Sequence, residues 1–328
     1  MSHALDPSGV VELAILQRSG LDESRHLGAA VVVAPDGTVL RQLGDGDALV
    51  YGRSSLKFFQ AITVLRSGVP LEGAQLVLAT ASHAGTPAHV AVVRSLLGRA
   101  SLTVDALQCP PNWPLDGAAR SAASAPERIT MNCSGKHAAF LLACVHNDWD
   151  PSTYLDPAHP LQQRIRETIE EFAGEPVGHV GVDGCGAPVF AISLRGLATA
   201  VGRVSSGTDP DAARLGAAIL AEPWAIDGPG RANTVVIERL GLITKGGAEG
   251  VIVMGTPDGT AVALKMLDGS ARATSLVALA LLASVGAISV ADADLVGALT
   301  TEKVLGAGVP VGVIRVSDEV RGVVPARA

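Results

Sequence analysis

Aromatic and charged residues are both scarce in this chain. Of its 328 residues, 3% are Phe, Trp or Tyr and 17% are Asp, Glu, Lys or Arg, whereas 48% are hydrophobic. A composition this apolar excludes an intrinsically disordered protein. Because aromatic rings are few, Ala, Val, Leu and Ile must fill most of the core. The length corresponds to about two domains, or to one large domain with an insertion.

Positive charge is also in short supply. The chain carries 25 Lys and Arg against 32 Asp and Glu, which gives a formal net charge of −7, and it has no run of basic residues. A protein that binds nucleic acid or an anionic membrane normally shows the opposite balance. We therefore expect neither as a partner.

Long hydrophobic runs are missing. The longest apolar stretch, 276–288, is interrupted by Ser284 and Gly286. It falls short of the ~20 residues that span a bilayer, so it predicts a buried helix. The first residues have neither the positively charged region nor the apolar region of a signal peptide. Together these features predict a cytoplasmic protein.

Cysteine is rare, with four residues in the chain. A chain of this length forms a core without disulfides, so free thiols are expected. Cys144 lies in an apolar segment and fits a core position. Cys133 and Cys185 differ, because each lies in a polar, glycine-containing loop.

Strand-like segments lie near both ends of the chain, and helical periodicity dominates its middle. The predicted strands are 10–17, 27–34, 38–43, 250–255, 260–266 and 309–316, and the predicted helices are 55–66, 87–97, 137–145, 160–172, 191–204, 211–221 and 271–285. Turn signals at 36–37 and 256–259 favour antiparallel hairpins.

This order predicts an α+β fold rather than alternating βαβ units. We expect residues 1–50 and 235–328 to form an antiparallel sheet with its helices, and residues 51–234 to form a mainly helical part. The active site would lie in the cleft between the two parts.

The segment Arg53-Ser54-Ser55-Leu56-Lys57 places Ser54 and Lys57 three residues apart, on one face of a helix. A serine hydroxyl needs a neighbouring base to act as a nucleophile, and a buried lysine can be that base. The S-x-x-K pattern occurs in class A β-lactamases and penicillin-binding proteins. The alternative is a capping serine beside a solvated lysine. Ser55 is a weaker candidate, because Phe58 occupies the matching position.

Ser82 and His83 lie in a short polar segment after an apolar run. Ser82 is placed to pass a proton between a nucleophile and a leaving group, with His83 assisting. A polar turn before the helix at Pro87 is the alternative reading.

Two further loops combine thiols with glycine, namely Asn132-Cys133-Ser134-Gly135-Lys136-His137 and Asp183-Gly184-Cys185-Gly186. Two thiolates are suitable ligands for a borderline metal such as zinc. The familiar C-x-x-C and H-x-x-x-H spacings are absent, so two unrelated loop thiols are the alternative.

Lys245-Gly246-Gly247-Ala248-Glu249-Gly250 precedes a predicted strand. It is similar to the K-T-G element that lines the β-lactamase cleft. A glycine-rich edge lets substrate lie against the strand, and a flexible turn is the alternative. The spacing is not that of a P-loop.

Taken together and in this order, these segments resemble the L-asparaginase II family, the thermolabile, rhizobial-type class that differs from the threonine-nucleophile enzymes. The matching segments are Arg53-Ser54-x-x-Lys57, Ser82-His83-x-Gly85, Cys133-Ser134-Gly135-Lys136-His137, Asp183-Gly184-Cys185-Gly186-x-Pro188 and Lys245-Gly246-Gly247-Ala248-Glu249-Gly250.

The resemblance implies a fold like that of serine β-lactamases and penicillin-binding proteins, a homodimer, and hydrolysis of L-asparagine to L-aspartate and ammonia. It implies that Ser54 is the nucleophile, that Lys57 is its base and that Ser82 completes the proton relay.

The resemblance also implies a zinc ion bound by Cys133, Lys136 and Cys185, with water in the fourth position. Asp183 would lie near the metal and help to hold the substrate. We expect Arg53, His83, Lys136 and Gly247 to complete the set of substrate-binding residues.

Two positions depart from the family pattern. Phe58 follows Lys57 where many relatives have proline, and Asn233 occupies the acidic position of a Gly-x-x-Arg-x-Asp-Thr stretch.

No SDN element is recognisable, which argues against a β-lactamase. A glutaminase or a broader ω-amidase remains an alternative, because one methylene is worth only ~1–3 kcal/mol of discrimination. A non-catalytic zinc or amino-acid binding protein is a second alternative, although such a protein has no need for Ser54, Lys57 and Ser82.

Overall fold

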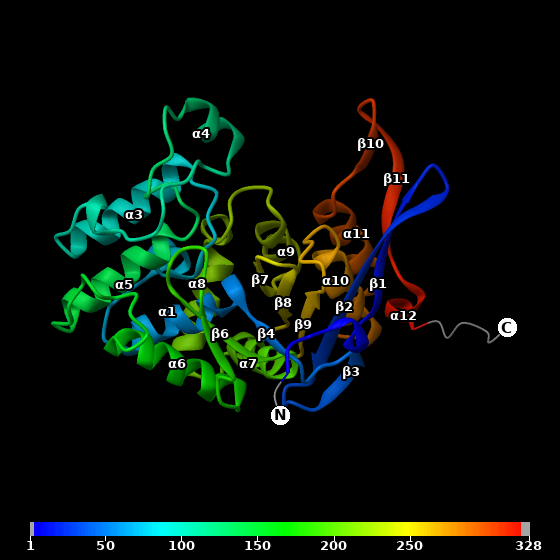
Figure 1. The fold of residues 1–328 in the computed structure, drawn as a ribbon, viewed down its shortest axis with the longest axis horizontal. Coiled ribbons are helices and arrows are strands. Elements are labelled where there is room, and N and C mark those ends of the chain that lie inside the picture. Colours follow the sequence, from blue (N-terminus) through cyan, green and yellow to red (C-terminus); the bar gives the residue numbers. More distant parts are fainter. Residues whose placement is uncertain (1–2, 323–328) are drawn as a thin grey trace.

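A computed structural model describes residues 3–322 of the chain as two adjoining lobes, one mainly helical and one built on a sheet (Figure 1). The large sheet has eight antiparallel strands, contributed by both ends of the sequence. They are β1 (Val11–Arg18), β2 (Leu21–Val33), β3 (Val39–Leu43), β7 (Ile243–Gly247), β8 (Val251–Gly255), β9 (Ala261–Met266), β10 (Val304–Gly306) and β11 (Val309–Val316). Their order is β10-β11-β1-β2-β9-β8-β7, and β3 pairs with β2. The fold is therefore a mixed α/β structure with an antiparallel sheet.

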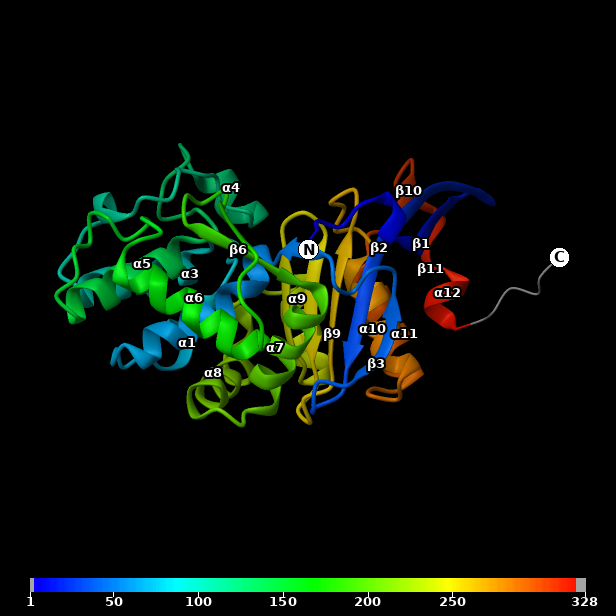
Figure 2. The same ribbon diagram turned by 60° about the horizontal axis from the view of Figure 1, so that its bottom comes forward.

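Both faces of this sheet are buried, as the alternation along β2 shows. Ala29, Val31 and Val33 belong to one apolar cluster, whereas Ala30 and Val32 belong to a second cluster on the opposite face. Helix α7 (Leu194–Ser206) covers the first face, and α10 (Thr274–Ser284) with α11 (Val290–Thr300) covers the second. Figure 2 shows the strands lying between these helices.

The helical lobe surrounds α5 (Ser134–His146), which is buried along nearly its whole length. Its other helices are α1 (Lys57–Arg66), α2 (Gly73–Thr80), α3 (Pro87–Arg99), α4 (Gly117–Ala122), α6 (Pro160–Ala173) and α8 (Pro210–Ala221). A small sheet in the order β4-β6-β5 links this lobe to the large sheet; its strands are β4 (Leu49–Tyr51), β5 (His179–Val182) and β6 (Pro188–Ser193). The two remaining α-helices of the described chain are α9 (Ala232–Leu240), which precedes β7, and α12 (Asp318–Arg321), which follows β11.

Most of the predicted elements are present, and one prediction is wrong in a specific way. The helix predicted over 191–204 begins only at Leu194, because Pro188–Ser193 forms β6. All six residues of β6 are buried, so an apolar run that reads as a helix start serves as a central strand. The sequence also gave no indication of α2, of α9 or of the edge strand β7 as separate elements. The predicted division of the chain at residues 50 and 235 stays a prediction, and α7 from the middle segment packs on the large sheet.

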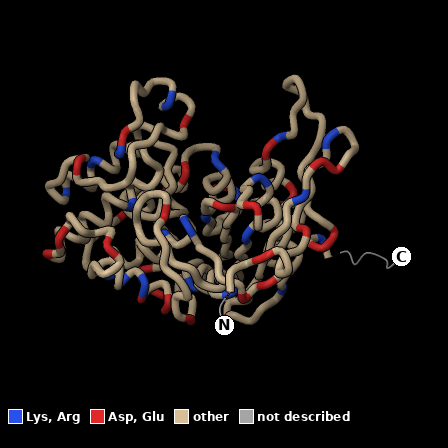
Figure 3. Tube along the Cα trace, viewed as in Figure 1, with Lys and Arg blue, Asp and Glu red and all other residues tan. Residues whose placement is uncertain are grey.

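Charged residues of both signs are interspersed over both lobes of the described chain (Figure 3). No helix within residues 3–322 is both long and apolar enough to cross a membrane.

The crossing of α5 over α2 depends on the absence of a side chain at Gly135. A β-carbon at Gly135 would lie 2.6 Å from the carbonyl oxygen of Leu78. We therefore expect Gly135→Ala to lower the free energy of unfolding by about 1–3 kcal/mol through overpacking. Gly98→Ala is the matched control: nothing lies within 4 Å of a β-carbon there, and alanine should stabilise α3 by about 0.5–1 kcal/mol. Urea unfolding measures both, and equal effects of the two variants would contradict the packing argument.

Candidate functional site

Lys57 is the buried centre of the candidate site. It begins α1, directly after the short 3-10 turn η2 (Arg53–Leu56), and only 1% of it is exposed. Its Nζ donates to the carbonyl oxygen of Ala81 at 2.6 Å, to Ser82 Oγ at 3.0 Å and towards Cys133 Sγ at 3.1 Å. One amine thus connects the start of α1, the segment after α2 and the turn before α5.

Ser54 lies in the η2 turn, half-buried, and its carbonyl oxygen accepts the backbone N–H of Lys57. Within residues 3–322, no hydrogen bond joins the Ser54 hydroxyl to the Lys57 amine, because that amine is directed at Ala81, Ser82 and Cys133. The S-x-x-K spacing therefore places the two residues on one turn without pairing their side chains. In ligand-free enzymes such contacts are often long and shorten when substrate binds.

Lys245 belongs to a segment that the sequence singled out, but no catalytic or binding role was predicted for it. It lies in the middle of β7 and is fully buried. Its Nζ donates to Ser82 Oγ at 2.8 Å and to the Gly246 carbonyl oxygen at 2.8 Å. Ser82 therefore accepts hydrogen bonds from two lysines, Lys57 and Lys245, and its own hydroxyl hydrogen is left to donate elsewhere. The similarity of the Lys245 loop to a K-T-G element was the signal that pointed to this residue.

Burial, reinforced by the charge of Lys57, lowers the pKa of Lys245 to about 7. A substantial fraction of Lys245 is therefore a neutral amine near neutral pH, able to take up a proton. Two lysines and a serine in hydrogen-bond contact form a chain along which a proton can pass.

His83 is buried, and among the described residues no hydrogen bond joins its ring to the Ser82 hydroxyl. Its Nδ1 accepts the N–H of Gly85 at 3.1 Å, and its Nε2 lies 2.9 Å from Ser134 Oγ. Burial, with the charges of His89 and Lys57, lowers the pKa of His83, so the ring is neutral. His83 thus ties the Ser82 segment to the start of α5.

Arg53 and Asp183 form an ion pair at the edge of the site, with Arg53 Nε 2.8 Å from Asp183 Oδ1. The Arg53 Nη1 atom also lies 4.0 Å from Glu249 Oε1, which the sequence analysis did not single out. Gly247 packs against the η2 turn at this edge of the site. A β-carbon at Gly247 would lie 3.3 Å from the backbone nitrogen of Ser54. The glycine allows the end of β7 to approach the serine turn closely.

Cys133, Lys136 and Cys185 come together on the other side of Lys57, and at most 5% of any of them is exposed. Lys136 Nζ lies 3.2 Å from Cys185 Sγ. Hydrogen bonding between the two sulfurs lowers the pKa of Cys185 far below its usual range and, together with burial, raises that of Cys133. Burial opposes the charge of Lys136, yet the two sulfurs raise its pKa.

These three side chains have the chemistry of a zinc site, namely two soft sulfurs and one nitrogen in a buried position. Within residues 3–322, no group of three His, Cys, Asp or Glu is placed to hold a metal ion, so Lys136 would have to be the third ligand. Only the neutral amine can donate to a metal, so binding must displace the proton of Lys136.

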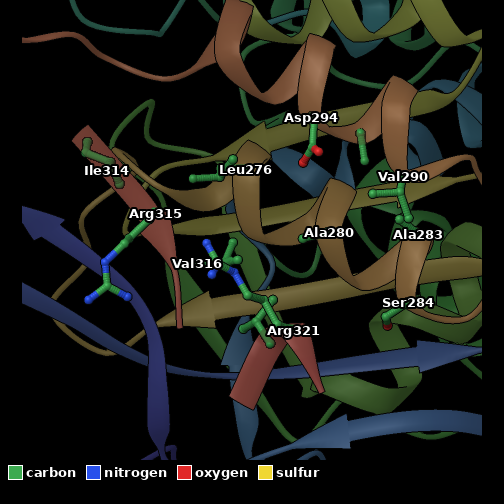
Figure 4. A pocket seen from close by; sticks show the side chains of 12 residues that line it. Leu276, Ala280, Ala283, Ser284, Val290, Asp294, Ile314, Arg315, Val316 and Arg321 are labelled. Atoms are coloured by element: carbon green, nitrogen blue, oxygen red, sulfur yellow. The ribbon is translucent and has the colours of Figure 1, made fainter. Parts of the chain in front are cut away.

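A separate cavity of about 450 Å³ lies in the sheet lobe, between α10, α11, β11 and α12 (Figure 4). It is lined mainly by apolar side chains, with Arg315 and Arg321 at its edge. None of the predicted site residues lines it.

The lowered pKa of Lys245 predicts a pH dependence of stability. Above pH 7 the amine is increasingly neutral in the folded state, whereas in the unfolded chain it stays charged up to its ordinary pKa of 10.5. The unfolded state then binds more protons, so the free energy of unfolding rises with pH. Lys245→Met should reduce this rise, between pH 7 and about 8.5, by roughly 1–2 kcal/mol relative to the unsubstituted protein. Urea unfolding at the two pH values measures it, with the exposed Lys303→Met as control, and an unchanged slope in Lys245→Met would be the contrary result.

Comparison with solved structures gives remote similarity. The chain matches "Crystal Structure Analysis of Mglu in its native form" at 13% identity and a TM-score of 0.43, covering 75% of this chain and 61% of that one. It matches "Crystal Structure Analysis of Mglu" at 15% identity and a TM-score of 0.42, covering 75% and 64% respectively. The chain thus spans about three fifths of the length of these structures. No curated protein matches it.

Comparison with protein families gives a match that extends over most of the chain. The family described as L-asparaginase II matches residues 14–316. This range contains every residue of the site described above, and a relationship to this family supports amidohydrolase activity. The match covers far more than half of the sequence, and the protein belongs to the L-asparaginase II family.

Proposed function

We propose that this protein hydrolyses the side-chain amide of L-asparagine to give L-aspartate and ammonia, through an acyl-enzyme formed on Ser54. The observation that carries the proposal is the hydrogen-bonded chain of Lys57, Ser82 and Lys245 next to the Ser54 turn, in which both amines are buried and Ser82 is partly buried. A binding protein gains nothing from burying two amines around one hydroxyl, whereas a hydrolase needs such a path for protons.

Acylation begins with attack of Ser54 Oγ on the amide carbon of the substrate. As the C–O bond forms, Lys57 passes one of its protons through Ser82 to the neutral amine of Lys245 and takes up the proton of the Ser54 hydroxyl. The developing oxyanion is placed against the backbone N–H of Ser54, beside the edge of β7 at Gly247. Each such donor is worth ~3 kcal/mol to the transition state.

The leaving nitrogen must receive a proton before the C–N bond breaks and ammonia departs. Ser82 is suited to deliver it, because Lys57 and Lys245 both donate to its oxygen and leave its own hydrogen available. Lys245, with its pKa of about 7, can then exchange the proton. In the second half of the reaction, water adds to the ester carbon, and the same groups return a proton to Ser54.

Recognition of the amino acid falls to the charged edge of the site. Arg53 can bind the α-carboxylate and Asp183 the α-ammonium group, exchanging part of their mutual ion pair for bonds to substrate. The side chains of Lys136 and His83 lie further inside, where they support the site through Cys185 and Ser134.

Cys133, Lys136 and Cys185 would hold a zinc ion, as their chemistry allows. When bound, the metal would supply a fixed positive charge that orients Asp183 and the neighbouring polar groups. We also propose that the fold is related to that of the serine β-lactamases, that the protein forms a homodimer, and that it is located in the cytoplasm.

Ser54→Ala tests the nucleophile. We expect this variant to fold normally and to lose nearly all release of ammonia from asparagine, because no other hydroxyl occupies the turn in the same way. Ser55→Ala is the matched control: the Ser55 hydroxyl donates to the Gly52 carbonyl oxygen and should matter only for stability. An ammonia assay with asparagine and glutamine as substrates measures both variants. Turnover that persists in Ser54→Ala would remove Ser54 from the mechanism, and a preference for glutamine would assign the amidase activity to that substrate.

Single thiol substitutions test the zinc proposal. Cys133→Ser and Cys185→Ser should each lose the metal, because each removes one of two sulfur ligands. Cys144→Ser, in the same helix as Lys136 but buried among apolar side chains, should retain it. Metal analysis of protein prepared without added zinc gives the stoichiometry. An absence of zinc from the unsubstituted protein even after zinc is supplied would refute the site.

A further inference from the structure

A loop before and at the start of α9 fixes both partners of the Ser82–Lys245 contact. The carbonyl oxygen of Ile226 accepts the backbone N–H of Ser82 at 2.9 Å. Seven residues later, Asn233 Oδ1 accepts the backbone N–H of Gly246 at 2.8 Å. One short segment, 226–233, therefore sets how far the Ser82 segment stands from the strand that carries Lys245.

The hydrogen bond from the Gly246 N–H to Asn233 takes the place of a bond to a further strand at the edge of the sheet. β7 is the last strand of the large sheet, and among residues 3–322 it pairs with β8 alone. An N–H that points away from β8 has no strand to bind, and leaving it buried without an acceptor would cost about 1–3 kcal/mol. Asn233, which is 8% exposed, supplies the acceptor directly beside Lys245.

Asp227 determines which way the Asn233 amide faces. The carboxylate of Asp227 accepts Asn233 Nδ2 at 2.9 Å and Arg231 Nε at 2.7 Å. The amide must therefore present its NH₂ to the carboxylate and its oxygen to Gly246. A carboxylate at position 233 could still accept the N–H of Gly246, but it could not donate to Asp227. It would also be repelled by the negative charge of Asp227.

We propose that Asp227 and Asn233 act as positioning residues that hold Lys245 against Ser82 and set the balance of charge that Lys245 faces. The inference rests on the proposed function, because it assigns Lys245 and Ser82 to the proton path. Neither Asp227 nor Asn233 contacts the reacting atoms in this assignment.

Four groups from three segments of the chain influence the charge of Lys245, and Asp227 and Arg231 share the segment before α9. Lys57, at the start of α1, and Arg231, before α9, disfavour its ammonium form; Asp227 and Cys133 favour it. Adding a negative charge at position 233 should therefore favour the ammonium form, and removing the charge of Asp227 should disfavour it. The two substitutions are nearly isosteric and predict shifts of opposite sign.

The five lysines of the chain make a direct measurement possible: Lys57, Lys136, Lys245, Lys265 and Lys303. NMR of full-length protein carrying ¹³C at the lysine ε-carbon follows each amine through a pH titration without any need for turnover. Asn233→Asp should move the Lys245 midpoint up by about one pH unit, and Asp227→Asn should move it down by a similar amount. The resonance of the exposed Lys303, which is remote in sequence from both substitutions, serves as the internal reference.

Two controls match these substitutions in chemistry. Asn112→Asp changes an exposed amide whose oxygen only accepts the N–H of Trp113. Asp211→Asn changes a carboxylate paired with Arg214 on α8. Neither should move the Lys245 midpoint.

The pH profile of ammonia release supplies the second readout. The acidic limb of this profile should shift together with the Lys245 midpoint in each variant. If Asp227 and Asn233 had only a structural role, the substitutions would lower kcat without moving the acidic limb. Folded variants whose Lys245 midpoint equals that of the unsubstituted protein would overturn the inference while leaving asparagine hydrolysis intact. Midpoints that shift as expected in a protein that releases no ammonia would support the positioning role and refute the proposed function.

Discussion

Burial of lysine is the constraint on which the rest of this structure depends. Three of the five lysines, Lys57, Lys136 and Lys245, are at most 1% exposed. An amine taken out of water is tolerated only if hydroxyl, carbonyl or thiol groups surround it, or if it gives up its proton. Ser82 serves two of these amines and Cys185 the third. The polar groups that surround these amines are thus a condition for folding, and the proposed function makes the same groups the means of catalysis.

The lysines divide the site into two halves with different chemistry. Lys57, Ser82 and Lys245 form a path of amines and a hydroxyl, whereas Cys133, Lys136 and Cys185 form a set of metal-type donors. Lys57 joins them, since its amine reaches both Ser82 and Cys133. A change in the charge of Cys133 therefore acts directly on Lys57, and through Lys57 on Ser82.

Sequence patterns identified several segments of the candidate site, because their polar residues stand next to one another in the chain. The segments around Ser54, Ser82, Cys133 and Cys185 stand out because polar and glycine residues interrupt an apolar chain, and the structure brings these segments together around Lys57. Prediction failed where a partner lies far along the chain. The spacing of Ser54 and Lys57 suggested a direct pair, but the lysine side chain is attracted to Ala81, Ser82 and Cys133, which no helical periodicity can foresee.

The sequence by itself determined the antiparallel ends, the helical middle and the identity of the reactive residue types, because hydrophobic alternation and turn residues act over short distances. Only the tertiary structure decided that Lys245 shares Ser82 with Lys57, that Pro188–Ser193 is a strand, and that Asn233 replaces the missing neighbour of β7. Each of these depends on burial and on contacts between segments distant in the chain. Such contacts exist only once both faces of the sheet have been covered.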